Sequence, residues 1–141
     1  TTVLLFNHDS IYRNNKFLLP RLAKAFIKKD KNFIEKIFSL NISGDFSNAE
    51  DICKGIYKLS IYPKKIDKLI LSSGKRFYIN RIIDYLSKKF LFEIKKDQKI
   101  LNHNYKILGS NKLAKKLLKF KSEKNLFNTI DKIINNYKKI N

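Results

Sequence analysis

The sequence predicts an α/β protein, because short apolar segments of strand length alternate with longer segments that carry apolar residues at helical spacing. Thr1 to Phe6 (TTVLLF) and Lys68 to Leu71 (KLIL) are the clearest strands, and Ile79 to Phe90 is the clearest helix. With 141 residues, of which 43% are hydrophobic, the chain can form one domain with a sizeable core and is not a disordered tail.

The first strand carries four successive apolar residues and runs directly into a polar cluster at positions 7 to 10. Such a strand has to be covered on two faces and needs neighbouring strands on both sides, and no earlier residue supplies them. The sequence also contains no methionine that would mark a natural start. We therefore expect it to be the second half of a larger protein.

Helices and one short strand follow. A helix is expected over Phe17 to Lys29, and it begins effectively at Pro20 because proline fits the first turn of a helix. Lys36 to Leu40 (KIFSL) is expected to be a short strand. A Ser-Asn pair then caps a helix over Ala49 to Leu59, and acidic residues just inside this helix lie near its positive end.

The second half of the chain continues the alternation. A Ser-Ser-Gly turn leaves the strand KLIL and leads to the clearest helix. Leu91 to Ile94 is expected to be another strand, Lys95 to Asn104 a polar loop, and Tyr105 to Leu108 an extended segment. Two helices, Lys112 to Leu118 and Leu126 to Tyr137, complete the expected α/β arrangement.

The formal charge of +19 normally suggests nucleic acid, an anionic membrane or phosphorylated ligands as partners. Only four of the 31 basic residues are arginines, and the lysines are spread along the chain beside many Asn, Ile, Phe and Tyr. A surface that reads phosphate or base geometry would favour the arginine fork. We interpret the charge as that of a solvent-exposed surface whose lysines reflect a coding bias toward AT-rich codons. Nucleic acid is therefore not the expected partner.

The single cysteine, Cys53, excludes an internal disulfide framework and fits a reducing compartment. Its neighbours predict a small core residue on an apolar helix face. No apolar segment approaches the ~20 residues of a membrane span, and no signal sequence opens the chain. We therefore expect a cytoplasmic protein.

His8 and His103 have no Cys or His partner at ligand spacing, so we predict no metal site.

Four polar motifs occur along the chain, in the order LFNHDSIYRNNKFLLPRL, NISGDFSNAEDI, LILSSGKRFYINRII and YKILGSNKLAKKLLKF. Together they resemble the second half of the GDP-mannose 4,6-dehydratase family, within the extended short-chain dehydrogenase/reductase superfamily of sugar-nucleotide enzymes. The first is similar to the family's strand ending in N-H-E-S and the helix that follows a Phe, and the second to G-N-L-D leading into R-D-W-G-H-A-x-D-Y. The third is similar to V-I-A-T-G-E-T, and the fourth to L-L-G-D-P-S-K-A-x-x-x-L-G-W.

The resemblance implies an α/β substrate-binding lobe that follows a nucleotide-binding Rossmann unit. Residues 1–30 would continue that unit with the last part of its sheet, and residues 31–141 would form the lobe. Family members hold NAD(P), oxidise the sugar at carbon four, eliminate water across carbons five and six, and return the hydride to carbon six. The implied whole protein is thus a homo-oligomeric dehydratase, or a related epimerase, that acts on a nucleotide-diphospho-sugar.

The chain itself shows neither the cofactor motif nor the catalytic pair of this family. None of its four glycines forms the glycine fingerprint that brings backbone amides to a pyrophosphate. NAD(P) would therefore be bound mainly by the missing N-terminal half, where the family's catalytic Tyr and Lys also lie. Tyr12 and Lys16 have the spacing of that pair, but they fall in a turn, and we assign no catalytic residue.

The resemblance implies that this chain contributes residues that contact the substrate. Asn7 matches the asparagine that touches the diphosphate, and its amide can donate to a phosphate oxygen without a buried charge. Arg13 and Arg21 match basic positions of the family, and Lys99 best matches the arginine of a later R-x-x-E motif. The alternative for Asn7 is a residue that only ties the turn, and for the two arginines a pair of surface cations.

Three departures put the affinity for the nucleotide, or its identity, in doubt. Gly44 stands where the family has the arginine of R-D-W, and two residues are deleted nearby. Asn102 replaces the acid of R-x-x-E, and Lys75 replaces the acidic residue after the turn glycine. Two other classes of function stay open: a basic nucleic-acid-binding or ribosomal protein, and a non-catalytic relative that only binds a nucleotide sugar or pairs with a partner subunit.

Overall fold

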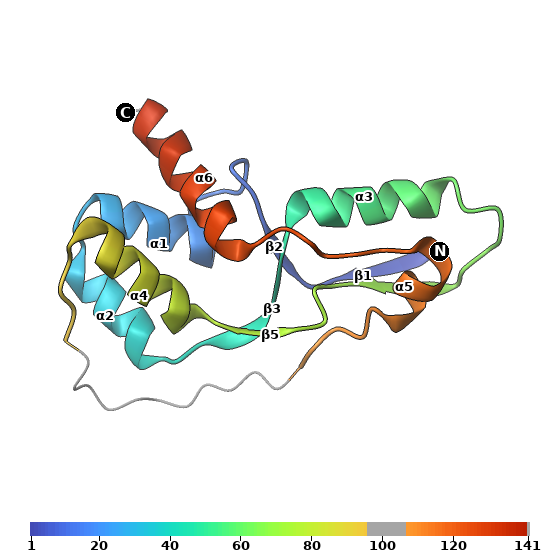
Figure 1. The fold of residues 1–141 in the computed structure, drawn as a ribbon, viewed down its shortest axis with the longest axis horizontal. Helices are drawn as coiled ribbons and strands as arrows, with labels where there is room; N and C mark the ends of the chain where they lie inside the picture. The colour runs from blue at the N-terminus through green and yellow to red at the C-terminus, as the bar shows by residue number, and fades with distance from the viewer. Residues whose placement is uncertain (96–106, 141) are drawn as a thin grey trace.

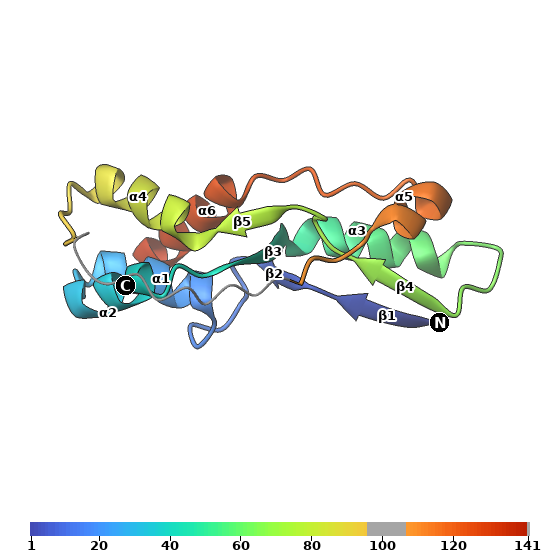
Figure 2. The ribbon, with the colours of Figure 1, turned by 90° about the horizontal axis from the view of Figure 1, so that it is seen from below.

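The structure is a computed structural model that describes residues 1–95 and 107–140, and it alternates strands and helices in an elongated body (Figures 1 and 2). The helices are α1 Leu18–Ile27, α2 Lys31–Ser39, α3 Ala49–Ser60, α4 Ile79–Phe90, α5 Lys112–Leu118 and α6 Leu126–Ile140. The strands are β1 Thr2–Leu5, β2 Asn7–Asp9, β3 Ser43–Asn48, β4 Lys68–Leu71 and β5 Arg76–Tyr78. The predicted α/β class is confirmed.

The strands form two small sheets. β1 pairs with β4 in parallel, and Leu5 lies opposite Leu71 at the carboxyl end of both strands. In the second sheet β2 runs parallel to β3, and β5 pairs antiparallel with the other edge of β3. The second sheet therefore begins where the first one ends, because β2 follows β1 after a single residue and β5 follows β4 after a short turn.

Two hydrophobic clusters flank this junction (Figure 1). The larger cluster gathers apolar residues of α1, α2, α4 and α6, and the smaller one gathers residues of α3, β4 and α5, with Val3 of β1 packed against it. In the figure the second sheet lies between the two groups of helices. Polar residues at the strand ends are thereby held in the middle of the molecule.

The strand predicted over Lys36 to Leu40 is wrong, because this segment belongs to helix α2. The Asp30 carboxylate accepts the Phe33 backbone N–H at 3.1 Å and caps the helix. Ile34, Ile37 and Phe38 are buried, and their spacing of three and four residues is that of a helix face. The predicted strand begins at residue 36, so its pattern leaves out Ile34. Together with Ile37 and Phe38, Ile34 indicates a helix.

The strand predicted over Leu91 to Ile94 is also wrong. Leu91 adopts a left-handed conformation (φ 49°) and ends α4, and the Phe92 N–H then bonds back to the Ser87 carbonyl at 2.9 Å. The Phe92 ring packs 5.9 Å from the ring of Phe26 in the larger cluster. The segment is therefore a helix end folded onto the core.

The expected helices over 17–29, 49–59, 79–90, 112–118 and 126–137 are confirmed with small shifts of their ends. Asn48 is the cap of α3, since its Oδ1 accepts the Glu50 N–H at 2.8 Å. Pro20 lies in the first turn of α1, which begins two residues before it. Most of the predicted loop over 95–104 and of the extended segment over 105–108 lies outside the described residues, and residues 107–108 are in no strand.

One expectation about burial is wrong. Cys53 is exposed on α3, because the buried face of that helix is made by Asp51, Ile52 and Gly55. The first strand is not covered on both faces by the described residues. In β1, Leu4 is 51% and Leu5 43% exposed, and β4 is the one described strand that pairs with it.

No described helix has both the length and the apolar character needed to cross a lipid bilayer.

Candidate functional site

Asn7 lies at the first position of β2, just beyond the carboxyl end of the parallel β1–β4 pair. Its amide Nδ2 donates a hydrogen bond to the Asp45 backbone carbonyl of β3 at 3.4 Å, and the side chain is otherwise exposed. A Cβ added at Gly44 would lie 4.0 Å from Asn7 Nδ2. The structure therefore places Asn7 directly beside the position at which the resembled family carries its arginine.

Arg13 lies in the turn between β2 and α1, where its guanidinium covers the Phe17 ring at 3.6 Å from the ring centre. Its Nε is 3.9 Å from Oδ1 of the buried Asp9. Burial raises the pKa of Asp9, although the positive charges of Arg13 and His8 lower it. Arg13 thus lies in the turn before α1, stacked on an aromatic ring and attracted by a buried carboxylate.

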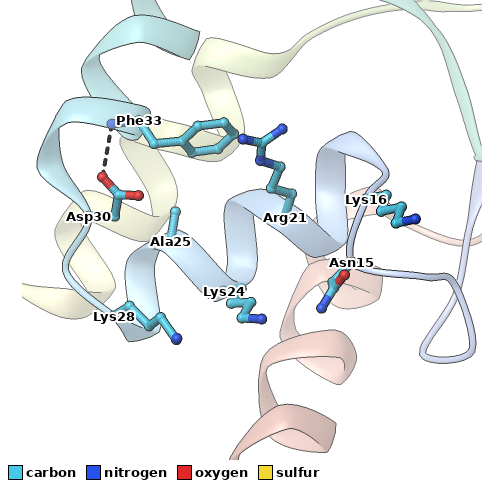
Figure 3. Close-up of a pocket in the computed structure, with 8 residues that line it drawn as sticks. All are labelled: Asn15, Lys16, Arg21, Lys24, Ala25, Lys28, Asp30 and Phe33. Carbon is cyan, nitrogen blue, oxygen red and sulfur yellow. Dashed lines mark hydrogen bonds between the residues drawn. The ribbon is translucent and has the colours of Figure 1, made fainter.

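Arg21 lies one turn into α1, and its guanidinium stacks over the Phe33 ring of α2 at 4.4 Å (Figure 3). Between the two helices is a cavity of about 370 Å³, which we call the α1 groove. Arg21, Lys24 and Lys28 follow one face of α1, and Lys16 precedes the helix. The α1 groove is lined by Asn15, Lys16, Arg21, Lys24, Ala25, Lys28, Asp30 and Phe33.

The predicted substrate residues therefore do not all converge. Asn7 is brought to Gly44, Arg13 covers Phe17, and Arg21 lines the α1 groove, in which neither Asn7 nor Arg13 takes part. Lys99 lies outside the described residues, as do Asn102 and His103, so their predicted roles stay predictions.

The lysines of the α1 groove were missed from the sequence because they were grouped with the solvent-facing charges. Their signal is the spacing of Arg21, Lys24 and Lys28, which places three cations on one helix face. An aromatic residue at position 33 completes the groove from the next helix.

Tyr12 and Lys16 do not form a catalytic pair in this structure. Tyr12 lies in a turn and is 90% exposed, and the helix begins only after Lys16. The Lys16 backbone N–H donates to the Asn14 side chain at 2.9 Å, as in a turn. His8 lies in strand β2, with its Nδ1 2.8 Å from the Phe6 carbonyl oxygen. Within residues 1–95 and 107–140 no group of His, Cys, Asp or Glu is placed to hold a metal ion.

Asp45 of β3, whose carbonyl accepts the Asn7 hydrogen bond, joins β3 to the turn after β4. Its buried carboxylate accepts hydrogen bonds from the Ser73 N–H (2.8 Å), the Ser73 hydroxyl (2.6 Å), the Gly74 N–H (2.9 Å) and the Gly109 N–H (3.2 Å). Gly74 has a φ of 70°, which a glycine adopts without strain. The carboxylate therefore fixes the β4–β5 turn and the backbone at position 109 against β3.

A second cavity of about 620 Å³ lies between the segment after β2, the start of α3 and α6. Tyr12, Cys53, Thr129 and Lys132 contribute to its wall. The exposed thiol thus faces a cavity in place of the core position that the sequence predicted for it.

No model of a known protein family matches the chain. In sequence it is similar to GDP-6-deoxy-D-talose 4-dehydrogenase of Aggregatibacter actinomycetemcomitans, with 27% identity over 106 residues. These residues are 74% of this chain and 35% of the relative, so the chain spans about a third of that protein.

Solved structures match over nearly the whole chain. The RMD enzyme of Pseudomonas aeruginosa, complexed with NADPH, has a TM-score of 0.73 at 16% identity, over 96% of this chain and 46% of its own. The UDP-glucuronic acid 4-epimerase of Bacillus cereus, complexed with UDP-glucuronic acid and NAD, has a TM-score of 0.75 at 16% identity, over 99% of this chain and 45% of its own. At such identities the likeness establishes the fold.

The broader resemblance, to extended short-chain dehydrogenases/reductases that act on sugar nucleotides, is confirmed by the curated relative and by these structures, and the closer likeness to GDP-mannose 4,6-dehydratase is not confirmed by them. The chain has the α/β fold that extended short-chain dehydrogenase/reductase structures of this kind show over about 45% of their length.

Proposed function

We propose that this chain is the sugar-nucleotide-binding part of an NAD(P)-dependent nucleotide-sugar dehydratase or epimerase, most like GDP-mannose 4,6-dehydratase. The observation that carries the proposal is the position of Asn7. This side chain follows the carboxyl end of a parallel strand pair, where open α/β sheets bind their ligands, and it flanks Gly44.

In this proposal Asn7 donates its second amide hydrogen, the one not bonded to the Asp45 carbonyl, to a phosphate oxygen of the substrate. Its bond to the Asp45 carbonyl fixes the side chain, since Asp45 is itself held by the β4–β5 turn. Arg21 supplies positive charge to the diphosphate, and its stacking on Phe33 limits the entropy lost on binding. Arg13 and Lys99 remain proposed contacts of the same ligand.

NAD(P) would supply the hydride transfer, and it would be bound mainly by the part of the protein that carries the glycine fingerprint. The chain's own residues would bind the nucleotide and orient the sugar toward that cofactor. We place residues 1–30 with the Rossmann unit and residues 31–141 in the substrate lobe, and we expect a cytoplasmic homo-oligomer. The curated relative is named for a GDP-sugar, which supports a guanine nucleotide as the first candidate.

The test uses the full-length protein that contains this chain. GDP-mannose and UDP-glucuronic acid are titrated by calorimetry in the presence of NADP, and products are analysed by mass spectrometry for loss of water. Asn7→Ala is expected to weaken binding of the accepted nucleotide sugar by about tenfold, the value of one hydrogen bond to a charged group. Asn32→Ala, on the exposed side of α2, is the matched control and leaves binding unchanged.

Three results separate the alternatives. Binding without turnover of the sugar would identify a non-catalytic relative. Equal losses in the two asparagine variants would show that Asn7 does not touch the ligand. Absence of binding to any nucleotide sugar would refute the proposed function.

A further inference from the structure

We propose that the α1 groove binds the diphosphate of the nucleotide substrate, and that its lysines replace the arginine lost at Gly44. This inference rests on the function proposed above. It assigns to Lys16, Lys24 and Lys28 a role that the family resemblance does not give them.

Unbalanced positive charge is the first argument. Four cations line the groove, and in the part of the chain that the structure describes none of them forms an ion pair with a carboxylate. The one acidic residue of the lining, Asp30, already accepts the Phe33 backbone N–H through Oδ1. Gathering like charges in a concave site raises their mutual repulsion, which a bound anion would relieve.

Preorganisation is the second argument. The Arg21 guanidinium lies on the Phe33 ring at 4.4 Å, and the ring is placed by the capped first turn of α2. A guanidinium held in this way loses little freedom when it binds a phosphate oxygen. The Asn15 side chain adds amide donors at the end of the groove near Lys16 (Figure 3).

The third argument is the positive charge that is missing beside Asn7. An arginine at position 44 would have supplied charge there, and glycine supplies none. Arg21 is the one described cation that both matches a basic position of the family and lines a cavity with other cations. The row of cations from Arg21 through Lys24 to Lys28 is therefore our candidate for the replacement of the missing charge.

The experiment measures binding of inorganic pyrophosphate and GDP to the full-length protein by calorimetry. In the double variant Lys24→Gln/Lys28→Gln, the affinity for both probes is expected to fall about tenfold or more. The control, Lys115→Gln/Lys116→Gln, removes the same charge from the exposed face of α5 and leaves both affinities unchanged. Equal losses in the two double variants, or no loss in either, would overturn the inference.

Two further readouts separate this inference from the proposed function and from a nucleic-acid site. If Asn7→Ala weakens nucleotide-sugar binding and the α1 double variant does not, the function stands and the groove is not its diphosphate site. If pyrophosphate binds through the lysines but no nucleotide sugar binds, the groove is an anion site and the proposed function fails. A single-stranded RNA whose affinity falls more than that of pyrophosphate in the α1 variant would identify a nucleic-acid surface and overturn the assignment.

Discussion

The Asp45 carboxylate binds Ser73 twice, through the backbone N–H at 2.8 Å and the hydroxyl at 2.6 Å. Ser73 lies two residues after the end of β4 and Asp45 lies within β3, and Gly74 and Gly109 donate to the same carboxylate. The carboxylate and the Gly109 N–H are buried, so water cannot replace this hydrogen bond, whereas the bonds from Ser73 and Gly74 are partly buried.

Asp45→Ala is therefore expected to lower the free energy of unfolding by about 2–5 kcal/mol, since it removes four hydrogen bonds to a charged acceptor and leaves the buried Gly109 N–H without a partner. Denaturant unfolding of the full-length protein measures the change. Asp67→Asn is the control, because that carboxylate is exposed and its removal should change the stability by less than about 0.5 kcal/mol. A small effect of Asp45→Ala would mean that the turn is held by other contacts.

Gly44→Arg is expected to restore the charge that the family carries beside Asn7 and to tighten GDP binding by about tenfold. The new Cβ would come within 3.3 Å of the Phe46 ring, which has to shift by a few tenths of an ångström, and the backbone at Gly44 has no positive φ. Calorimetric titration with GDP measures the gain. Gly44→Ala introduces the same steric contact without charge, so equal affinities in the two variants would contradict the prediction.

Two substitutions of Asp30 separate its structural and electrostatic roles. Asp30→Ala removes the cap of α2 and is expected to cost about 1 kcal/mol of stability. Asp30→Asn keeps an acceptor for the Phe33 N–H and removes only the negative charge, so stability is retained and pyrophosphate binds more tightly to the α1 groove. Denaturant unfolding and calorimetry give the two quantities. Equal destabilisation in both variants would argue against the cap.

Asp131 joins α4 to α6 in a pH-dependent contact. It accepts from the Tyr85 hydroxyl at 2.6 Å and from Lys89 Nζ at 2.7 Å, and these hydrogen bonds raise the pKa of Tyr85 and of Lys89. A pKa raised by folding gives stability that is fully present below the ordinary values of 10.0 and 10.5 and is lost as the pH rises through the raised values.

Asp131→Asn is expected to lower the stability by about 1 kcal/mol near neutral pH, because the pair is partly exposed. The difference from the unsubstituted protein should shrink as the pH rises above about 10. Denaturant unfolding over this pH range measures it. Glu123→Gln, which removes an exposed ion pair with Lys121, should show no such trend, and a difference that grows with pH would contradict the assignment.

The sequence predicted the α/β class and most helices, because amphipathic spacing and the cap at Asn48 are local signals. It failed at β3 and β5, whose residues SGDFSN and RFY are too polar and too short for a strand pattern. These strands exist because they pair with each other and with β2, which only the tertiary structure shows. Asn7 could be selected from the motifs, whereas Asp45 could not be distinguished from a surface acid until its partners were known.

The free edge of β1 has a practical consequence for any preparation of residues 1–141 alone. Within the described part of the chain its other edge pairs only with β4, and Leu4 and Leu5 expose apolar side chains beside unpaired backbone groups. Strands of this kind pair with identical copies in solution and promote aggregation. The isolated chain is therefore expected to precipitate as its concentration rises, which is why binding is best measured on the full-length protein.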